Sequence, residues 1–446
     1  MSDQPTAQAN PPAIAEPSNA VRQPSGRFSD ITSRAAWMLV ACSPIIFALL
    51  TWPIFFFAAQ DAVRHYSLPI VAIEMTTVVL ALATGWQPSQ SLAAAPPWCK
   101  AALAILGAVA TGTALFVAPG QPAAVLRTLT SIFHVLFALS LVHLFAKAWR
   151  PLDTAIWPSI ALGTLGYVVL LVPYVASITN PENFDWGYFM FGVTNVRQTG
   201  FYSVVGACVA FGLAISSNDK RTYSLWLVVA SILLAESFWS GTRSSLIAFA
   251  AACIVGLRLF PSLRTLRAAR SFMLSTVLGL MLSLLHQVPH PLFGALRLWI
   301  ASGSADPGTG RLEIWRGTAR MFLERPLFGF GESQFRLLLP EVEGAYNHPH
   351  NWVLQILFQW GLVGAVCYFS LAVFIWFRFE GAIRRMGSAA LPAYLTATSL
   401  LIYSLYEGTM YHPYPIAMLA VAVAWAFAGT QGRGRHEHGR MVPSHF

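Results

Sequence analysis

The sequence predicts an all-α protein that crosses a lipid bilayer many times. Hydrophobic residues make up 56% of the 446 residues, and charged residues only 11%. A soluble domain carries roughly 25% charged residues, so this chain lacks the polar surface that would cover a water-facing globule of its size. Its apolar residues gather in runs close to the length that a helix needs to cross a bilayer, about 20 residues. These observations exclude a water-soluble globular protein.

The apolar runs form two groups, separated by one long polar segment. Residues 1–34 are rich in Pro, Ala, Ser and Gln without an apolar period, which predicts a disordered tail. No small-residue cleavage pattern follows the first run, so we expect a retained helix and not a signal peptide. Nine helices are predicted within 35–289 and three within 351–430, before a basic tail at 431–446. The twelve predicted runs are 35–58, 67–84, 101–118, 125–146, 155–176, 199–216, 223–240, 245–261, 271–289, 352–377, 389–406 and 413–430.

Arginine and lysine predict the orientation of these helices. If the N-terminus lies in the cytoplasm, 18 basic residues fall in cytoplasmic segments and 4 in the short segments on the other side. This distribution follows the positive-inside rule. It places both termini in the cytoplasm and the long segment 290–350 outside. Since topology accounts for the net charge of +9, no nucleic-acid partner is expected.

The long outer segment is predicted to contain short helices. Residues 306–311 have the composition of a turn, and apolar residues recur at helical spacing after it. Arg316 and Arg320 lie one turn apart on another stripe. They are expected either to contact substrate or to belong to a solvated amphipathic helix on the bilayer surface. Pro326 and the glycines after it end this helix, and residues 335–339 form a short second one. The predicted apolar stripe is Leu312, Trp315, Ala319 and Phe322.

The run Asn347-His-Pro-His-Asn351 stands immediately before the tenth predicted span. His350 is therefore expected close to the N-terminus of a helix, where free backbone N–H groups favour anions such as phosphate. The same helix end disfavours imidazolium, so a neutral histidine that accepts a proton is expected. His348 and Asn351 are candidate binding residues beside it. The outer segments show no clustered carboxylates with metal-ligand spacing, so neither a metal nor another cofactor is expected.

Two shorter polar motifs interrupt the spans on the same predicted side. Arg243 lies in Gly241-Thr-Arg-Ser-Ser245 between two spans, and Arg197-Gln198 begins another span. An arginine at such a depth is costly unless it is paired or reaches water, so a structural ion pair of Arg243 with Glu236 is one alternative. The other is a cluster with Arg311, because arginine forks suit phosphate.

Three further ionisable residues, Glu74, His134 and His143, lie in or near predicted spans. A proton-coupled transporter needs such residues near the middle of the membrane, together with repeat symmetry. We expect these three to be scattered and satisfied by packing, and no internal repeat is visible. The sequence therefore favours an enzyme over a transporter.

Several of these motifs resemble those of one family. Gly310-Arg-Leu-Glu-Ile-Trp315, Pro326-Leu-Phe-Gly-Phe-Gly331, His348-Pro-His-Asn-Trp-Val-Leu-Gln355 and Gly361-Leu-Val-Gly364 resemble the outer loop of the O-antigen ligase and O-antigen polymerase superfamily. Gly241-Thr-Arg-Ser-Ser-Leu246 is similar to its motif of small residues around an arginine. The resemblance covers about residues 200–371.

The resemblance implies a GT-C-like, metal-independent and inverting glycosyltransferase of the bacterial inner membrane, with its active site on the periplasmic face. The donor would be an O-antigen glycan on undecaprenyl pyrophosphate, and the acceptor a sugar hydroxyl of lipid A–core within the surrounding membrane lipids. His350 corresponds to the family's essential histidine, the general base. Arg243 and Arg311 correspond to its arginines, which stabilise the pyrophosphate, and Arg197 is a weaker correspondence.

Three functions remain open at this point. A ligase transfers the glycan to lipid A–core, whereas a polymerase of the same superfamily transfers it to another lipid-linked unit, and a transporter does no chemistry. The resemblance favours the ligase. The candidate site is then His350, Arg311 and Arg243, with binding roles for Arg197, Gln198, His348, Asn351, Arg316 and Arg320.

Overall fold

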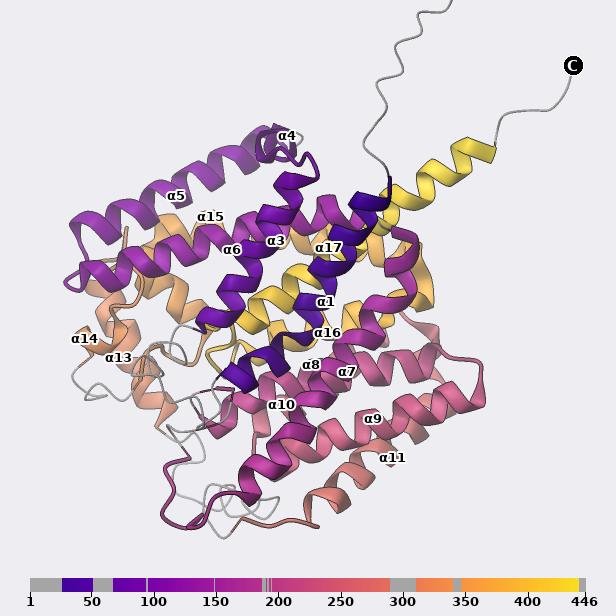
Figure 1. Ribbon diagram of the computed structural model, residues 1–446. Helices are drawn as coiled ribbons and strands as arrows, with labels where there is room; N and C mark the ends of the chain where they lie inside the picture. Colours follow the sequence, from indigo (N-terminus) through magenta and orange to yellow (C-terminus); the bar gives the residue numbers. More distant parts are fainter. Residues whose placement is uncertain are drawn as a thin grey trace, which may run out of the picture.

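The computed structural model describes residues 26–50, 67–93, 95–147, 149–186, 190, 192–193, 195–288, 310–339 and 346–440. Throughout these residues the regular structure is helical, without strands, and Figure 1 shows the helices packed as one bundle. The elements are α1 (Gly26–Leu50), α3 (Leu68–Ala83), α4 (Pro88–Ala93), α5 (Pro97–Phe116), α6 (Gln121–Lys147), α7 (Trp149–Ala176), η1 (Val196–Gln198), α8 (Thr199–Ser216), α9 (Lys220–Trp239), α10 (Arg243–Gly256), η2 (Pro261–Arg264), α11 (Leu266–Ser283), α13 (Arg311–Glu324), α14 (Phe335–Leu338), α15 (Trp352–Met386), η4 (Gly387–Ala390), α16 (Leu391–Tyr403), η5 (Thr409–Tyr411) and α17 (Pro413–Arg440).

The predicted fold class is confirmed, because each of the twelve predicted apolar runs overlaps one of these helices. Among the described residues, eight helical segments are long and apolar enough to cross a membrane, and one of them joins α15 and α16. The helices α3 and α10 are apolar but shorter.

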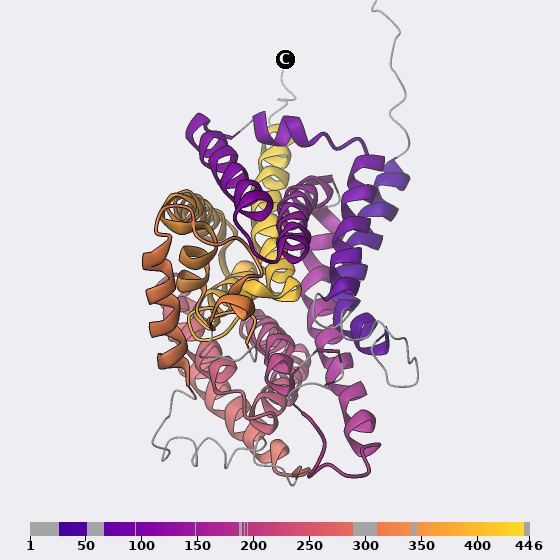
Figure 2. The same cartoon turned by 90° about the vertical axis from the view of Figure 1, so that its left-hand side faces the viewer.

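Both ends of the chain differ from the predicted boundaries. The helix α1 begins at Gly26, so residues 26–34 are helical, while the rest of the predicted tail lies outside the described residues. At the other end α17 continues to Arg440, into the predicted basic tail. The start of α1 and the end of α17 lie in the upper part of both Figure 1 and Figure 2.

The helix α8 is the centre of the bundle. Of its apolar window, 89% is buried within the protein, a larger share than in any other of the candidate spans. It packs against α7, α9, α10 and α16. Because η1 leads directly into α8, the most buried of the candidate spans fixes the position of Arg197 and Gln198.

The helix α15 is broken at Gly361, which has a φ of 61°. Such a break frees backbone groups, and in a membrane protein these must find partners within the protein. The segment 326–331 supplies them, and Gly329 and Gly331 adopt positive φ there. The predicted helix break at Pro326 is thus confirmed. The bonds run from the N–H groups of Phe330, Gly331, Leu362 and Val363 to the carbonyls of Phe358, Gln359, Pro326 and Leu327, over 3.0, 2.8, 2.7 and 3.1 Å.

The predicted short helices of the outer segment are present as α13 and α14, at the left of Figure 1. The predicted apolar stripe of α13 is wrong, however. Leu312 and Ala319 are exposed, and the buried residues are Ile314, Gly317 and Thr318. The reason is that α13 packs on α15, where Ile314 joins a small core with Phe358.

The loop between α13 and α14 is also anchored to the start of α6. The buried Gln334 side chain accepts the N–H of Gly120 over 2.8 Å and donates to its carbonyl over 3.2 Å. Next to it, the hydroxyl of Ser131 donates to Glu332 Oε2 over 2.9 Å. Two side chains therefore connect the outer segment with the hairpin of α5 and α6.

The expectation that Glu74, His134 and His143 are scattered is wrong for the first two. Glu74 Oε2 and His134 Nδ1 are 2.7 Å apart and both residues are buried. Glu74 lies on α3 and His134 on α6, and the side-by-side packing of these two helices brings the residues together. His143 lies apart from this pair, with Nε2 3.3 Å from the hydroxyl of Thr84.

Candidate active site

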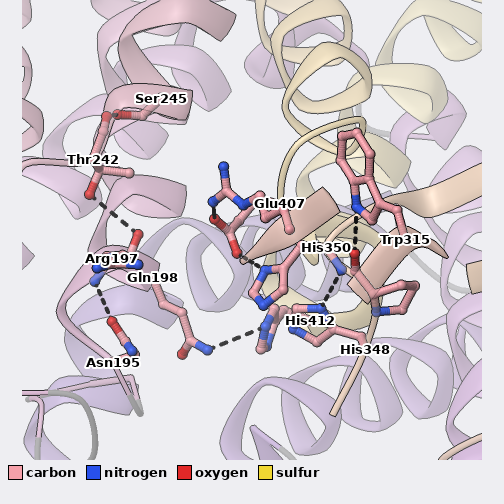
Figure 3. A network of polar contacts seen from close by, with 12 residues as sticks. Asn195, Arg197, Gln198, Thr242, Ser245, Trp315, His348, His350, Glu407 and His412 are labelled. Carbon is pink, nitrogen blue, oxygen red and sulfur yellow. Dashed lines mark hydrogen bonds and ion pairs between the residues drawn. The ribbon is translucent and has the colours of Figure 1, made fainter. Parts of the chain in front are cut away.

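The His-Pro-His run has an unusual backbone that two contacts hold in place. His350 has a φ of 53°, a left-handed conformation that is uncommon for a residue other than glycine. Its N–H donates to His348 Nδ1 over 3.3 Å, and Trp315 Nε1 of α13 donates to the carbonyl of Pro349 over 2.9 Å (Figure 3). Strained backbones persist where neighbours over-determine them, so these contacts fix the direction of the His350 ring.

The start of α15 is less open to anions than the sequence suggests. Asn351 caps this helix, with its Oδ1 accepting the N–H of Leu354 over 3.0 Å. The N–H of Trp352 donates to the carbonyl of Ser404 over 2.9 Å. Two of the N–H groups expected to bind phosphate are therefore engaged within the protein. Asn351, a predicted binding residue, acts here as a cap, and its Nδ2 donates to the carbonyl of Leu405 over 3.2 Å.

A carboxylate that the sequence analysis missed lies at the centre of the site. Glu407, between α16 and α17, contacts His350 Nδ1 with Oε1, and its Oε2 accepts from Arg311 Nη2 over 2.8 Å. Figure 3 shows His350 between Glu407 and His412. One carboxylate thus holds two of the three predicted catalytic residues at once.

This contact determines which nitrogen of His350 can act as a base. Burial alone would raise the pKa of Glu407, but His350 and Arg311 outweigh burial and hold that pKa well below its usual range. The group is therefore a carboxylate, which can only accept hydrogen bonds. His350 Nδ1 must carry the proton in this contact, and the lone pair of the neutral ring is at Nε2.

The three predicted arginines are brought together from distant parts of the chain. Arg311 begins α13, Arg243 begins α10, and Arg197 lies in η1 before α8. Arg197 interacts electrostatically with Glu407, Arg311 and Arg243. The hydroxyl of Thr242 reaches the carbonyl of Arg197 over 3.5 Å, which connects two of the three segments (Figure 3). The three segments predicted to lie on one face of the membrane therefore meet in the structure, while the membrane face itself stays a prediction.

His348 is a support of the site and not a lining residue. Its side chain is buried, and burial lowers its pKa far below the usual range, with further lowering by the charges of His350 and His412. The ring packs so closely on Gly408 that a Cβ there would collide with it. A neutral His348 that accepts the N–H of His350 explains why the two histidines are separated by one residue.

Gln198 and His412 form a second polar pair beside the catalytic histidine. Their Nε2 atoms are 3.4 Å apart, and both side chains are partly exposed. The His412 ring also lies against Phe201, with 5.0 Å between ring centroids. Gln198 was a predicted binding residue, whereas His412 was missed.

The remaining predicted residues lie apart from this centre. Arg316 and Arg320 are exposed on α13, on the part of the helix beyond Arg311. Their predicted contact with substrate stays a prediction. As for metals, the described part of the chain contains no group of three or more His, Cys, Asp or Glu side chains that could hold an ion.

The position of Glu407 and His412 in the sequence could have indicated a role in the site. They lie in Glu407-Gly-Thr-Met-Tyr-His412, a polar interruption between the last two spans. Because successive spans cross the membrane in opposite directions, that segment is predicted to lie on the same side as His350. It was overlooked because a lone acid has no ligand spacing, and because its partners are distant in sequence.

Comparison with known proteins gives a match to a family model. A family model described as O-Antigen ligase matches residues 228–369, about a third of the chain. The matched stretch includes Arg243, Arg311 and His350 and ends before Glu407. Among curated proteins, none matches the chain significantly.

Proposed function

We propose that this chain, whose residues 228–369 are consistent with membership of the O-antigen ligase and O-antigen polymerase superfamily, moves a glycan from a lipid pyrophosphate to a sugar hydroxyl. The observation that carries the proposal is the shared carboxylate of Glu407, which holds His350 and Arg311 at once. A base and a cation are thereby positioned side by side. Glycosyl transfer from an anionic leaving group needs this combination.

His350 Nε2 is the proposed general base. It takes the proton of the acceptor hydroxyl as the hydroxyl oxygen attacks the anomeric carbon, and the bond from that carbon to the pyrophosphate oxygen breaks. A single displacement of this kind inverts the anomeric centre. Glu407 keeps the proton of the resting ring on Nδ1 and stabilises the positive charge that the ring gains, as a buried carboxylate does for histidine in hydrolytic triads. General base catalysis contributes about 10²–10⁴-fold in rate.

The arginines are proposed to stabilise the leaving pyrophosphate. Arg311 uses one N–H group for Glu407, and a guanidinium has five. Arg243 and Arg197 add positive charge on the same side of the site. A well-placed donor to a developing anion contributes about 3–4 kcal/mol to the transition state. Because arginines carry this charge, the proposal needs no divalent metal ion for the leaving group.

Gln198 and His412 are proposed to bind hydroxyl groups of a substrate sugar. Both lie partly exposed beside His350, and both side chains can donate and accept hydrogen bonds. Arg316 and Arg320 are proposed as more distant contacts with a substrate. The buried His348 and the capping Asn351 have supporting roles instead.

The proposed substrates follow from the family. The donor is an O-antigen glycan on undecaprenyl pyrophosphate, the acceptor is lipid A–core, and the reaction takes place on the periplasmic face of the inner membrane, with both termini in the cytoplasm. The positive-inside distribution of basic residues supports this orientation. Since both substrates are anchored in lipid, they would approach the site laterally between helices.

Deletion of the gene, followed by electrophoresis of lipopolysaccharide, tests this assignment. A ligase predicts core without any O-chain, restored by the wild-type gene and not by a His350→Ala gene that inserts normally. Core carrying a single unit would instead identify a polymerase. An unchanged lipopolysaccharide profile would contradict both.

A further inference from the structure

Arg127 is a buried arginine on a long apolar helix, and the proposed reaction does not use it. It lies in the second turn of α6 and is only 4% exposed. Burial of a guanidinium within a membrane helix is costly unless specific partners compensate. A buried arginine at position 127 therefore indicates a specific structural or functional role.

Arg127 contacts the loop between α16 and α17. Arg127 Nη1 donates to the carbonyl of Tyr411 over 3.2 Å, and its guanidinium lies over the Tyr411 ring at 4.0 Å from the centroid. One side chain thus holds the backbone and the ring of the same residue. Stacking on an aromatic ring and bonding to a carbonyl suit the planar guanidinium better than the ammonium of lysine.

Tyr411 in turn connects Arg127 with the catalytic histidine. The rings of Tyr411 and His348 are 5.0 Å apart, and those of His348 and His350 are 4.4 Å apart. His348 also accepts the N–H of His350. On this path two residues, Tyr411 and His348, lie between Arg127 and the base.

The same loop carries the other support of His350. Glu407 lies four residues before Tyr411, and the N–H of Tyr411 donates to the carbonyl of Gly408 over 2.9 Å. A movement of Tyr411 would therefore displace Gly408, on which His348 packs, and Glu407, which holds His350 Nδ1. Both contacts that orient His350 depend on the place of this loop.

We propose that Arg127 is a positioning residue for the catalytic histidine, which it orients by fixing Tyr411 and hence His348 and Glu407. This inference rests on the proposed role of His350 as the base. It assigns to α6, a helix outside the segment that matches the family model, an indirect influence on the rate of the chemical step. Misplacement of a catalytic group by about 1 Å can cost about 100-fold in rate.

The test is steady-state kinetics of purified full-length Arg127→Gln, Arg127→Lys and Tyr411→Leu variants with a lipid-pyrophosphate glycan and lipid A–core. We expect kcat per folded molecule of Arg127→Gln to fall by between about 10- and 100-fold, with the KM for each lipid within about twofold of wild type. Arg127→Lys should be intermediate, because it can still donate to the Tyr411 carbonyl. Tyr411→Leu should lower kcat while it keeps that carbonyl.

Arg258→Gln is the matched control, because it removes a different arginine from its ion pair with Glu380. Its kcat should stay at the wild-type value. A folded Arg127→Gln protein with wild-type kcat, or one in which only KM rises, would overturn the proposal. If Arg127→Gln does not fold, Tyr411→Leu decides by the same criterion, and failure of both to fold would make Arg127 a folding determinant only. Absence of transfer by the wild-type protein, by contrast, would contradict the proposed function itself.

Discussion

At the scale of single residues, the site is organised around a carboxylate with two partners. Glu407 selects the tautomer of His350 and restrains Arg311. The sequence revealed Arg197 and Arg243 because each interrupts an apolar run, where charge is costly. It revealed Arg311 and His350 because they lie in motifs of the polar outer segment. It did not reveal Glu407, since pairing across more than 50 residues depends on how helices pack and not on local spacing.

The first prediction concerns Glu407. Glu407→Gln should lower kcat by about 10²–10⁴-fold, because a neutral amide no longer fixes the tautomer of His350 or stabilises its charge. Kinetics with saturating lipid substrates measure the effect. Glu324→Gln, an exposed change at the end of α13, is the control and should leave kcat unchanged. Wild-type activity in Glu407→Gln would show that His350 acts without this carboxylate.

The second prediction separates charge from geometry at the arginines. Arg311→Lys and Arg243→Lys keep a positive charge but lose the planar fork that matches phosphate. We expect kcat to fall by about 10- to 100-fold in each, which is less than the about 10²–10³-fold cost of losing one oriented donor outright, because lysine keeps the charge. Arg336→Lys, at an exposed position of α14, should have no effect. Full activity in both site variants would argue against binding of the pyrophosphate by guanidinium groups.

At the scale of elements, the broken helix α15 positions the site. Its first half begins at the His-Pro-His run, and the segment 326–331 bonds to the backbone at the break. The sequence predicted the helix break at Pro326 and the glycines after it, but not the break at Gly361, which lies inside the predicted span 352–377. The break at Gly361 depends on a contact between two segments that are separate in the sequence.

The third prediction tests this contact. Gly361→Ala should destabilise the protein, because Gly361 has a φ of 61° and a Cβ there would collide with the backbone of Leu327. A backbone with φ 61° and ψ −165° is essentially restricted to glycine, and it costs a residue with a Cβ on the order of 1–3 kcal/mol. A lower Tm in detergent is the expected result. Gly107→Ala in α5 has open space around it and should keep or raise Tm. Equal Tm values for the two variants would contradict this explanation of the break.

The fourth prediction concerns the anchor of the outer segment on α6. Burial raises the pKa of Glu332 to about 7, although bonds from Ser131 and the charge of Arg127 lower it. Because the folded protein holds this proton more tightly than the unfolded chain, Glu332 stabilises the fold below pH 4.5, and this contribution is lost as pH rises through 7. The loss amounts to roughly 3 kcal/mol.

Thermal unfolding at pH 5 and pH 8 measures this effect. The Tm of the wild-type protein should fall more between these two values than the Tm of Glu332→Gln, which cannot lose a proton at this position. Other titratable groups are present in both proteins, so their contributions cancel in the comparison. The same decrease in Tm for both proteins would show that Glu332 is not the group responsible.

At the scale of the whole molecule, composition and hydrophobic run length were sufficient to predict the fold class. Each predicted span overlaps a helix, because the bilayer demands long apolar helices whatever their packing. The way the helices pack was not predictable in this manner. The Glu74–His134 pair, the central place of α8 and the contact of Arg127 with Tyr411 all depend on which helices are neighbours. The single sequence contains no direct signal for that.

The most direct test of the central claim is transfer by purified His350→Ala protein, compared with wild type at saturating donor and acceptor. The account predicts that kcat falls by about 10²–10⁴-fold, while the protein folds normally and binds the lipid pyrophosphate with wild-type affinity, since the arginines remain. A folded His350→Ala protein that transfers glycan at the wild-type rate would contradict it.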